Sequence, residues 1–135
     1  MVDSAIASGT AGRRSVFEVF ARRLPGERRY GVVAGTGRVV EAIRDFRFGP
    51  EEIAYLESAG IVSERTLAWM EGYRFTGDVY GYAEGECYFP YSPVLTVLGT
   101  FAEACVLETV ILSILNHDSA GGAAPPPATA TAPAP

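Results

Sequence analysis

The sequence predicts a single α+β domain, and three observations lead to that class. Short segments of alternating apolar residues lie near both ends of the chain, apolar residues recur at helical spacing between them, and a long apolar helix follows. The chain has 135 residues, of which 48% are hydrophobic and 20% are charged, a balance typical of one globular domain. We expect residues 1–118 to fold and residues 119–135, which contain only Ala, Pro, Gly, Thr and Ser, to form a disordered tail.

The first folded segment is predicted to be a β-hairpin over residues 15–34. Branched and aromatic side chains dominate residues 15–24, and residues 30–34 form a second apolar run. Pro25 and Gly26 lie between the two runs, and a tight turn favours Pro at its second position and Gly at its third.

Three short helices are predicted in the middle of the chain. The first follows a Gly-Thr-Gly run that ends the preceding strand. Pro50 indicates the start of the second, because a first helical position needs no N–H, and that helix should end near Gly60. Ser63 suits the N-cap of the third, and Gly72 is expected to end it in a left-handed conformation. The predicted helices span residues 38–46, 50–60 and 64–71.

The last third of the chain is predicted to contain three strands and one helix. A turn at Glu84 and Gly85 separates the first two strands, and the third follows Pro93. The helix should begin near Gly99 or Thr100. The expected strands span residues 79–83, 86–89 and 94–98, and the expected helix spans residues 101–116.

This last helix is rich in Val, Leu and Ile, and at 100° per residue its polar residues are predicted to scatter around its circumference. A helix without a polar face is normally covered on every side. Leaving several large aliphatic side chains in water would forfeit roughly 1.5–3 kcal/mol for each. We therefore expect a partner chain or a further part of this chain to cover the helix. The polar residues concerned are Glu103, Glu108, Thr109, Ser113 and Asn116.

Charge and hydropathy exclude several classes of function. All eleven basic residues are Arg, and the net charge is -5. An acidic chain of this kind lacks the basic surplus of a nucleic-acid-binding protein, so no nucleic-acid partner is expected. The longest apolar stretch, residues 104–115, is shorter than the ~20 residues of a membrane span, and no secretory leader is recognised. We expect a cytoplasmic protein with no membrane partner.

The Arg residues are unevenly distributed. Residues 1–47 contain nine Arg and five acidic residues, a net +4, whereas residues 48–135 contain two Arg and eleven acidic residues, a net -9. Three Arg pairs occur in the basic part. They are interpreted either as solvated strand edges that resist edge-to-edge pairing or as a local anion-binding patch. The pairs are Arg13-Arg14, Arg22-Arg23 and Arg28-Arg29.

A glycine turn at residues 32–38 (VVAGTGR) has the order strand, glycines, helix that is typical of phosphate-binding loops. It lacks the third glycine of a dinucleotide fingerprint and the Gly-Lys-Ser/Thr of a P-loop. The simpler interpretation is a tight strand-to-helix turn. Under the alternative, a small ligand binder, Arg38 would meet an anion beside the helix N-terminus.

The other candidate groups do not assemble a recognisable active site. Glu84, Glu86 and Asp78 could hold a metal or share acid and base roles, but acidic residues on a hairpin tip are usually solvated. His117 and Asp118 are adjacent on a helix, where side chains point apart, and a terminal His also stabilises the helix end.

The cysteines and serines lead to the same conclusion. Cys87 and Cys105 lack metal-ligand spacing and are expected to be buried, reduced thiols. Ser4, Ser8 and Ser15 have no His and acid partners, so no nucleophile is assigned. No catalytic, cofactor-binding or metal-binding residue is assigned from the sequence.

Three segments resemble the N-terminal domain of bacterial nicotinate phosphoribosyltransferase, most closely the actinobacterial members. They are SVFEVFARRLPGERRYGVVAGTG at residues 15–37, FTGDVYGYAEGECYF at 75–89 and SPVLTVLGTFAEACVLETVILSILNH at 92–117, and the similarity spans residues 2–120. The resemblance implies a type II phosphoribosyltransferase, in which an α/β-sandwich domain packs on a barrel. It also implies NAD salvage: ligase and glycosyltransferase chemistry that joins nicotinate to phosphoribosyl pyrophosphate, uses ATP and Mg²⁺, and proceeds in subunits that associate.

The sequence departs from that family pattern in several places. An Asp/Tyr segment usual before Met1 is missing, and so is the barrel that carries the phosphohistidine, which His117 does not match. Leu98 and Tyr91 stand where the family usually has an acid and a small residue. After residue 120 the family's charged helical segment gives way to Ala, Pro and Thr, as a shifted reading frame in GC-rich DNA would give.

The sequence is therefore interpreted as an inactive, truncated or frame-shifted N-terminal fragment, for which no bound ATP or Mg²⁺ is expected. The alternative is a non-catalytic interaction module that pairs with the full-length enzyme, or with itself, through the helix at residues 101–116. Either interpretation predicts association through an exposed apolar helix.

Overall fold

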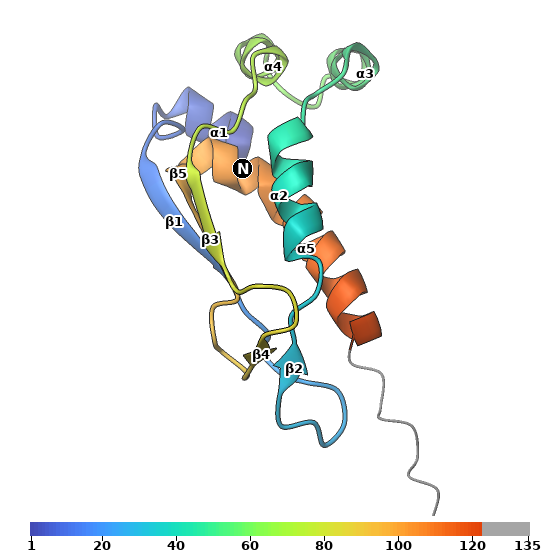
Figure 1. Cartoon of the computed structure of the whole chain (residues 1–135). Helices are drawn as coiled ribbons and strands as arrows, with labels where there is room; N and C mark the ends of the chain where they lie inside the picture. The colour runs from blue at the N-terminus through green and yellow to red at the C-terminus, as the bar shows by residue number, and fades with distance from the viewer. Residues whose placement is uncertain (123–135) are drawn as a thin grey trace, which may run out of the picture.

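The protein was analysed as a computed structural model, which describes residues 1–122. The described part contains a three-stranded sheet, a small two-stranded sheet and five helices (Figure 1). No helix among these residues is both long and apolar enough to cross a membrane. In chain order the elements are α1 (Val2–Ala7), β1 (Arg14–Val19), β2 (Gly31–Val32), α2 (Thr36–Asp45), α3 (Pro50–Ala59), α4 (Glu64–Glu71), β3 (Asp78–Gly81), β4 (Cys87–Tyr88), β5 (Leu95–Thr100) and α5 (Phe101–Gly122).

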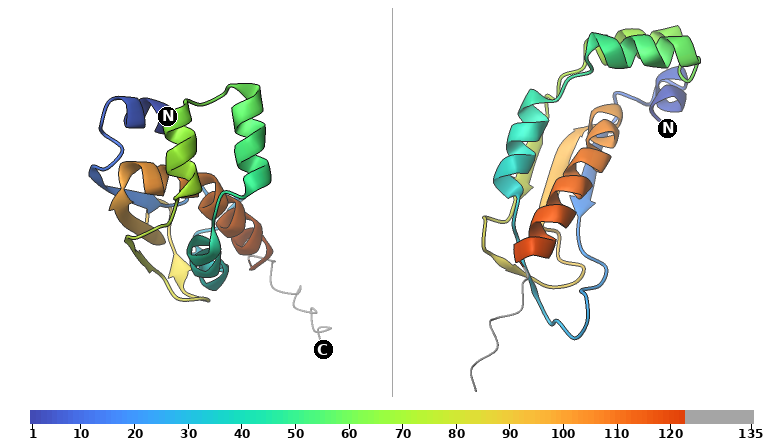
Figure 2. Two further views of the ribbon diagram at one scale, coloured as in Figure 1. Left: turned by 90° about the horizontal axis from the view of Figure 1, so that it is seen from above. Right: turned by 90° about the vertical axis from the view of Figure 1, so that its right-hand side faces the viewer.

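The main sheet has the strand order β1-β5-β3, and both pairings are antiparallel. Leu95 and Val97 of the central strand are each 1% exposed and face the core. Phe17 and Val79 flank Val97 in register and also pack against the core. The inner face of this sheet is thus an apolar surface on which α5 lies, with α2 beside α5 (Figure 2).

The predicted α+β class is confirmed, but the predicted hairpin over residues 15–34 is wrong. β1 pairs with β5 and β2 pairs with β4, so the two segments do not pair with each other. Phe17 and Val19 gain more apolar contact beside the buried Val97 and Leu95 than a local hairpin provides. Gly26 does adopt the expected positive φ, 61°, within the intervening loop.

The second predicted hairpin, across Glu84 and Gly85, is wrong for the same reason. β3 pairs with β5, whereas β4 pairs with β2 at the opposite end of the molecule from α3 and α4 (Figure 1). The turn itself forms, and Gly85 has φ 85°. β3 and β4 are shorter than the predicted strands at residues 79–83 and 86–89, whereas β5 extends beyond the predicted strand at residues 94–98 to Thr100.

The helix predictions are more successful. α3 begins at Pro50 and ends before Gly60, which is left-handed at φ 60°, and α4 spans residues 64–71 with the Ser63 side chain accepting from the Thr66 N–H. The predicted left-handed end at Gly72 is wrong, because Gly72 has φ -86° and ψ 2°. The six-residue α1 was not predicted.

The last helix begins with a capping box that joins Thr100 and Glu103. The Thr100 N–H donates to Glu103 Oε2 at 3.2 Å, and the Glu103 N–H donates to Thr100 Oγ1 at 3.4 Å. The helix continues through residues 119–122, which the sequence assigned to the tail. The remainder of the predicted tail, residues 123–135, lies outside the described residues.

The prediction that α5 needs cover from outside the chain is wrong. Leu107, Ile111 and Leu115 are at most 7% exposed, so the chain's own sheet and helices cover the apolar side. Glu103 lies in the cap, and Asp118 and Ser119 are half-buried near the end of the helix. The other polar residues of the helix share one exposed stripe, on which Leu112, 38% exposed, is the large apolar residue. The exposed positions of this stripe are Glu108, Thr109, Leu112, Ser113, Asn116 and His117.

The outer face of the main sheet is the less covered surface. Val16 and Tyr80 are 63% and 62% exposed, and Leu98, in register with Val16, is half-buried between their strands. Leu98 is one of the positions that departs from the family pattern. The second, Tyr91, is a non-glycine residue with φ 66°, in the left-handed region that favours glycine.

Candidate functional site

The glycine turn, residues 34–38, connects β2 to α2 and lies beside the end of α5. Gly35 adopts φ 98°, a left-handed conformation that favours glycine. A Cβ atom at this position would lie 2.7 Å from Asp118 Oδ2, so the close approach of α5 requires glycine as well. The turn therefore positions the N-terminus of α2 against the C-terminal part of α5.

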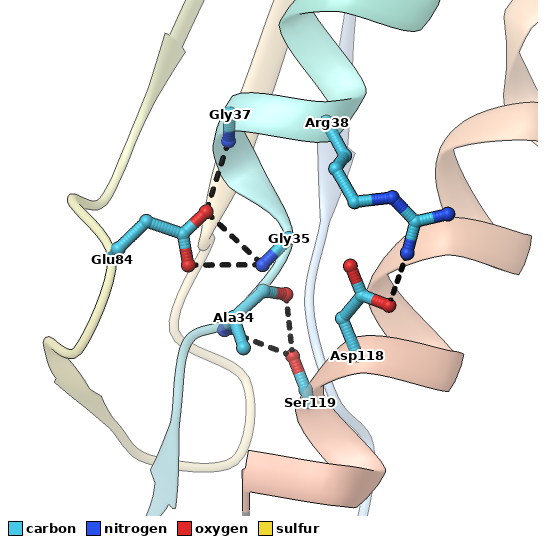
Figure 3. A network of polar contacts seen from close by, with 7 residues as sticks. All are labelled: Ala34, Gly35, Gly37, Arg38, Glu84, Asp118 and Ser119. Atoms are coloured by element: carbon cyan, nitrogen blue, oxygen red, sulfur yellow. Dashed lines mark hydrogen bonds and ion pairs between the residues drawn. The ribbon is translucent and has the colours of Figure 1, made fainter.

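The anion at this helix N-terminus is the chain's own Glu84. The Gly35 N–H donates to both carboxylate oxygens of Glu84 at 3.1 and 3.0 Å, and the Gly37 N–H donates to Oε1 at 2.9 Å (Figure 3). A carboxylate at this place satisfies free helical N–H groups and interacts favourably with the helix dipole. Glu84 thus occupies the position that a bound phosphate would need.

Arg38 and Ser119 complete the network around the turn. The Arg38 guanidinium donates to Asp118 Oδ1 at 2.5 Å, with side-chain exposures of 62% for Arg38 and 14% for Asp118. Ser119 Oγ donates to the Ala34 carbonyl at 3.2 Å and accepts from the Ala34 N–H at 3.3 Å (Figure 3). Both contacts hold the end of α5 to the glycine turn, which acts as a structural joint.

The structure favours the tight-turn interpretation of residues 32–38 over the phosphate-binding one. The Gly35 and Gly37 N–H groups donate to Glu84 and so are not available to an external anion, and Arg38 is paired with Asp118. His117 and Asp118 do not form an acid-base pair, because Asp118 accepts from Arg38 and His117 lies on the exposed stripe of α5.

The acidic residues near the turn at Glu84 and Gly85 are not assembled for metal binding. Glu86 and Asp78 are exposed, while Glu84 is directed at the glycine turn. Across residues 1–122 no group of three or more His, Cys, Asp or Glu is arranged to hold a metal ion.

The two cysteines are free, but the prediction that they are buried is wrong. Cys87 is exposed on the short strand β4, and Cys105 is half-buried near the start of α5. Burial, with a further contribution from Glu108, raises the pKa of the Cys105 thiol. A raised pKa lowers the thiolate fraction, which makes Cys105 a poor nucleophile.

A second polar cluster, which the sequence did not indicate, joins α1 to α4 through Asp3. Asp3 Oδ1 accepts from the Ser63 N–H at 3.0 Å, from Ser63 Oγ at 2.7 Å and from the fully buried Thr66 hydroxyl at 2.6 Å. These hydrogen bonds lower the pKa of Asp3 from 3.8 to about 2. The partners are some 60 residues apart in sequence, so no local pattern could have revealed them.

An aromatic cluster surrounds Tyr73, which follows the end of α4. The Tyr73 ring makes edge contacts with Phe46, Phe48 and Trp69, with ring centroids 5.5–5.7 Å apart. The Tyr73 hydroxyl donates to the Glu103 carbonyl at 3.0 Å, and burial raises the pKa of Tyr73. This side chain is therefore a buried structural donor and not an acid or base.

The architecture is that of an α+β domain found in phosphoribosyltransferase structures. Human nicotinic acid phosphoribosyltransferase superimposes with a TM-score of 0.77 at 25% identity, covering 85% of this chain and 24% of that one. Nicotinate-nucleotide pyrophosphorylase from Pyrococcus furiosus shares the fold, with a TM-score of 0.57 at 20% identity, over 84% of this chain and 22% of that one.

Sequence comparison identifies the family. Residues 1–116 match the model of the nicotinate phosphoribosyltransferase (NAPRTase) N-terminal domain. The chain is 54% identical over 120 residues to nicotinate phosphoribosyltransferase pncB1 of Mycobacterium tuberculosis, and 32% identical over 119 residues to nicotinate phosphoribosyltransferase of Bacillus subtilis. The chain belongs to the nicotinate phosphoribosyltransferase family, as the sequence resemblance predicted, and corresponds to its N-terminal domain.

The match covers most of this chain but a small part of its relatives. It includes 89% of this chain and 26% of the Mycobacterium tuberculosis protein, and 88% of this chain and 24% of the Bacillus subtilis protein. The chain thus spans about a quarter of the length of these curated relatives.

Proposed function

We propose that this chain acts as the N-terminal domain of a nicotinate phosphoribosyltransferase. The reaction would join nicotinate to phosphoribosyl pyrophosphate in NAD salvage, with ATP and Mg²⁺, in the cytoplasm. The observation that carries the proposal is the family match over residues 1–116, supported by 54% identity to a curated relative.

In this reaction, residues 1–122 would support the structure of the enzyme and would not themselves bind ATP, Mg²⁺ or the phosphoribosyl donor. Three carboxylates of the described part accept hydrogen bonds from other residues of the domain. They are those of Glu84, Asp118 and Asp3. ATP, Mg²⁺ and the phosphoribosyl donor would then be held by residues beyond this domain. Turnover accordingly requires the remaining three quarters of a family enzyme, and the 135-residue chain by itself is expected to be inactive.

A fragment-complementation assay tests this proposal. The 135-residue chain is mixed with the Mycobacterium tuberculosis relative from which the matching N-terminal quarter has been deleted, and nicotinate mononucleotide is measured with nicotinate, phosphoribosyl pyrophosphate and ATP. We expect neither part alone to exceed background and the mixture to regain activity. Product formation by the 135-residue chain alone would contradict the proposal, as would a mixture that associates but stays inactive.

A second role, a non-catalytic interaction module, is supported by the exposed Val16 and Tyr80 on the outer face of the sheet. In this role the chain would pair with a full-length family enzyme, and the contact surface would be the sheet and not α5. The two surfaces are compared by Val16→Arg on the sheet and Leu112→Arg on α5. Val16→Arg should abolish co-elution with the full-length enzyme in size-exclusion chromatography, whereas Leu112→Arg should not. If Leu112→Arg abolished co-elution and Val16→Arg did not, α5 and not the sheet would be the contact surface.

A further inference from the structure

A cavity of about 240 Å³ lies where the end of β1, the β2–β4 sheet and the C-terminal half of α5 meet. Ser119 is shared between the lining of this cavity and the network of the glycine turn, whereas Gly35, Arg38, Glu84 and Asp118 do not line the cavity. One wall is the arginine loop, residues 20–30, which connects β1 to β2. The volume is just below the range of drug-sized sites, so the cavity suits a small ligand.

The interior of the cavity is mainly aliphatic. Val94 and Leu115 are the large apolar lining residues that are buried, at 8% and 7% exposed, and Val19, Leu24 and Leu112 contribute further apolar surface. Exposed apolar surface of this kind favours a ligand with a hydrocarbon body, because each buried methylene group contributes about 0.8 kcal/mol in general.

The charged groups of the cavity are all positive. Arg23 and Arg28 are the ionisable cationic residues that line it, and no Asp or Glu is among the lining residues, although the chain carries a net charge of -5. The ion pairs found within residues 1–122 involve Arg38 and Arg44, so neither Arg23 nor Arg28 is neutralised there. Two exposed arginines on the lining of a largely apolar cavity match a carboxylate at one end of a hydrocarbon chain.

We propose that this cavity binds a short aliphatic carboxylate of about six to eight carbons. Its carboxylate lies toward Arg23 and Arg28, and its alkyl chain packs on Val94 and Leu115. The inference goes beyond the proposed phosphoribosyltransferase reaction and develops the anion-patch interpretation of the Arg pairs, of which Arg23 and Arg28 each contribute one member.

Calorimetric titration of the 135-residue chain with a series from butanoate to octanoate tests the site. The affinity should rise about fourfold for each added methylene group, and it should fall with added salt. Octanol, which lacks the charge, should bind more weakly than octanoate. Equal binding of octanol and octanoate, or the absence of any binding by octanoate at millimolar concentration, would overturn the proposal.

Variants locate the binding. Arg23→Gln and Arg28→Gln should each weaken octanoate binding about fivefold. The matched control is Arg29→Gln, which should leave binding unchanged because Arg29 follows Arg28 in the chain but does not line the cavity. Leu112→Glu places a carboxylate in the cavity at a position already 38% exposed and should abolish binding while the circular dichroism spectrum stays unchanged. Octanoate binding that survives Leu112→Glu would place the ligand elsewhere.

Competition separates this site from the proposed enzymatic role. Excess nicotinate should leave octanoate affinity unchanged, and octanoate binding should not depend on the complementing part of a family enzyme. If nicotinate displaced octanoate competitively, the assignment to an aliphatic ligand would be overturned, while the complementation result would still stand.

Discussion

The glycine turn and the arginine loop both place positive potential at the surface, but they differ in how that potential is balanced. At the glycine turn the helix N–H groups are satisfied by Glu84, and Arg38 is paired with Asp118. In the arginine loop, Arg23 and Arg28 lie beside an apolar cavity without a carboxylate in its lining. The glycine turn resembles a known binding motif but is a structural joint. The arginine loop matches no such motif and is nevertheless the better candidate for a ligand.

The largest expected effect is at Gly35. Gly35→Ala imposes a side chain on a left-handed residue and brings its Cβ to 2.7 Å from Asp118 Oδ2, so α5 or the turn must shift. We expect a loss of about 2–4 kcal/mol in the free energy of unfolding, measured by urea denaturation. Gly26→Ala, at φ 61° in the arginine loop with no atom within 4 Å of the added Cβ, is the matched control and should cost only about 1–2 kcal/mol. Equal losses at both sites would show that the joint is no more constrained than the loop.

A smaller effect is expected from removing the internal anion. Glu84→Ala leaves the Gly35 and Gly37 N–H groups without their partner and should destabilise the domain by about 0.5–2 kcal/mol, as the loss of a helix cap does. Thermal denaturation measures the change. Glu86→Ala removes an exposed carboxylate from the same turn and serves as the control. A Glu86→Ala variant as unstable as Glu84→Ala would mean that the hydrogen bonds to the turn contribute little.

The ion pair between Arg38 and Asp118 should matter less. Arg38 is 62% exposed, so solvent screens the attraction, and Asp118→Asn is expected to cost less than about 1 kcal/mol. Raising the salt concentration should reduce the difference between the variant and the parent chain in denaturation experiments. A loss well above that value would indicate that Asp118 has a role beyond this pair.

The third internally satisfied carboxylate, Asp3, predicts a difference confined to acidic pH. Its pKa is about 2 in the folded chain and 3.8 ordinarily, so the unfolded chain binds its proton first as pH falls. The stability that Asp3 contributes is therefore fully present above pH 3.8 and is lost as the pH falls toward 2. Acid denaturation of Asp3→Asn should lack this component of the pH dependence between those values. A parallel pH profile for the parent chain and the variant would contradict the assignment.

The parts of the fold that the sequence predicted correctly are those determined by neighbouring residues. Pro50 and Ser63 mark helix starts because their effects act within one turn of helix. The predicted strand pairing was wrong because Val97 and Leu95 of β5 pair with β1, about 80 residues away. The local turn residues do not reveal this pairing. The spacing of the polar stripe of α5 and the Thr100–Glu103 capping box are also local signals, which lie within a few turns of one helix.

The candidate site divides in the same way. The sequence located the glycine turn correctly, because strand, glycine and helix follow one another directly. It did not reveal that Glu84, 49 residues from Gly35, fills the anion position, or that Asp118 lies against the turn. Conversely, the Arg pairs were noted in the sequence, but the apolar cavity beside Arg23 and Arg28 depends on residues of β1, β4 and α5 that only the fold brings together.

Amide chemical shifts of Gly35 and Gly37 test the central distinction between the two regions most directly. In a nitrogen-proton correlation spectrum of the 135-residue chain, titration with inorganic phosphate should leave both signals in place, because Glu84 already accepts from these N–H groups. In Glu84→Ala the same titration should move both signals. A saturable movement of both signals in the unmodified chain would contradict the account, since it would make the glycine turn an open anion site and not an internally satisfied joint.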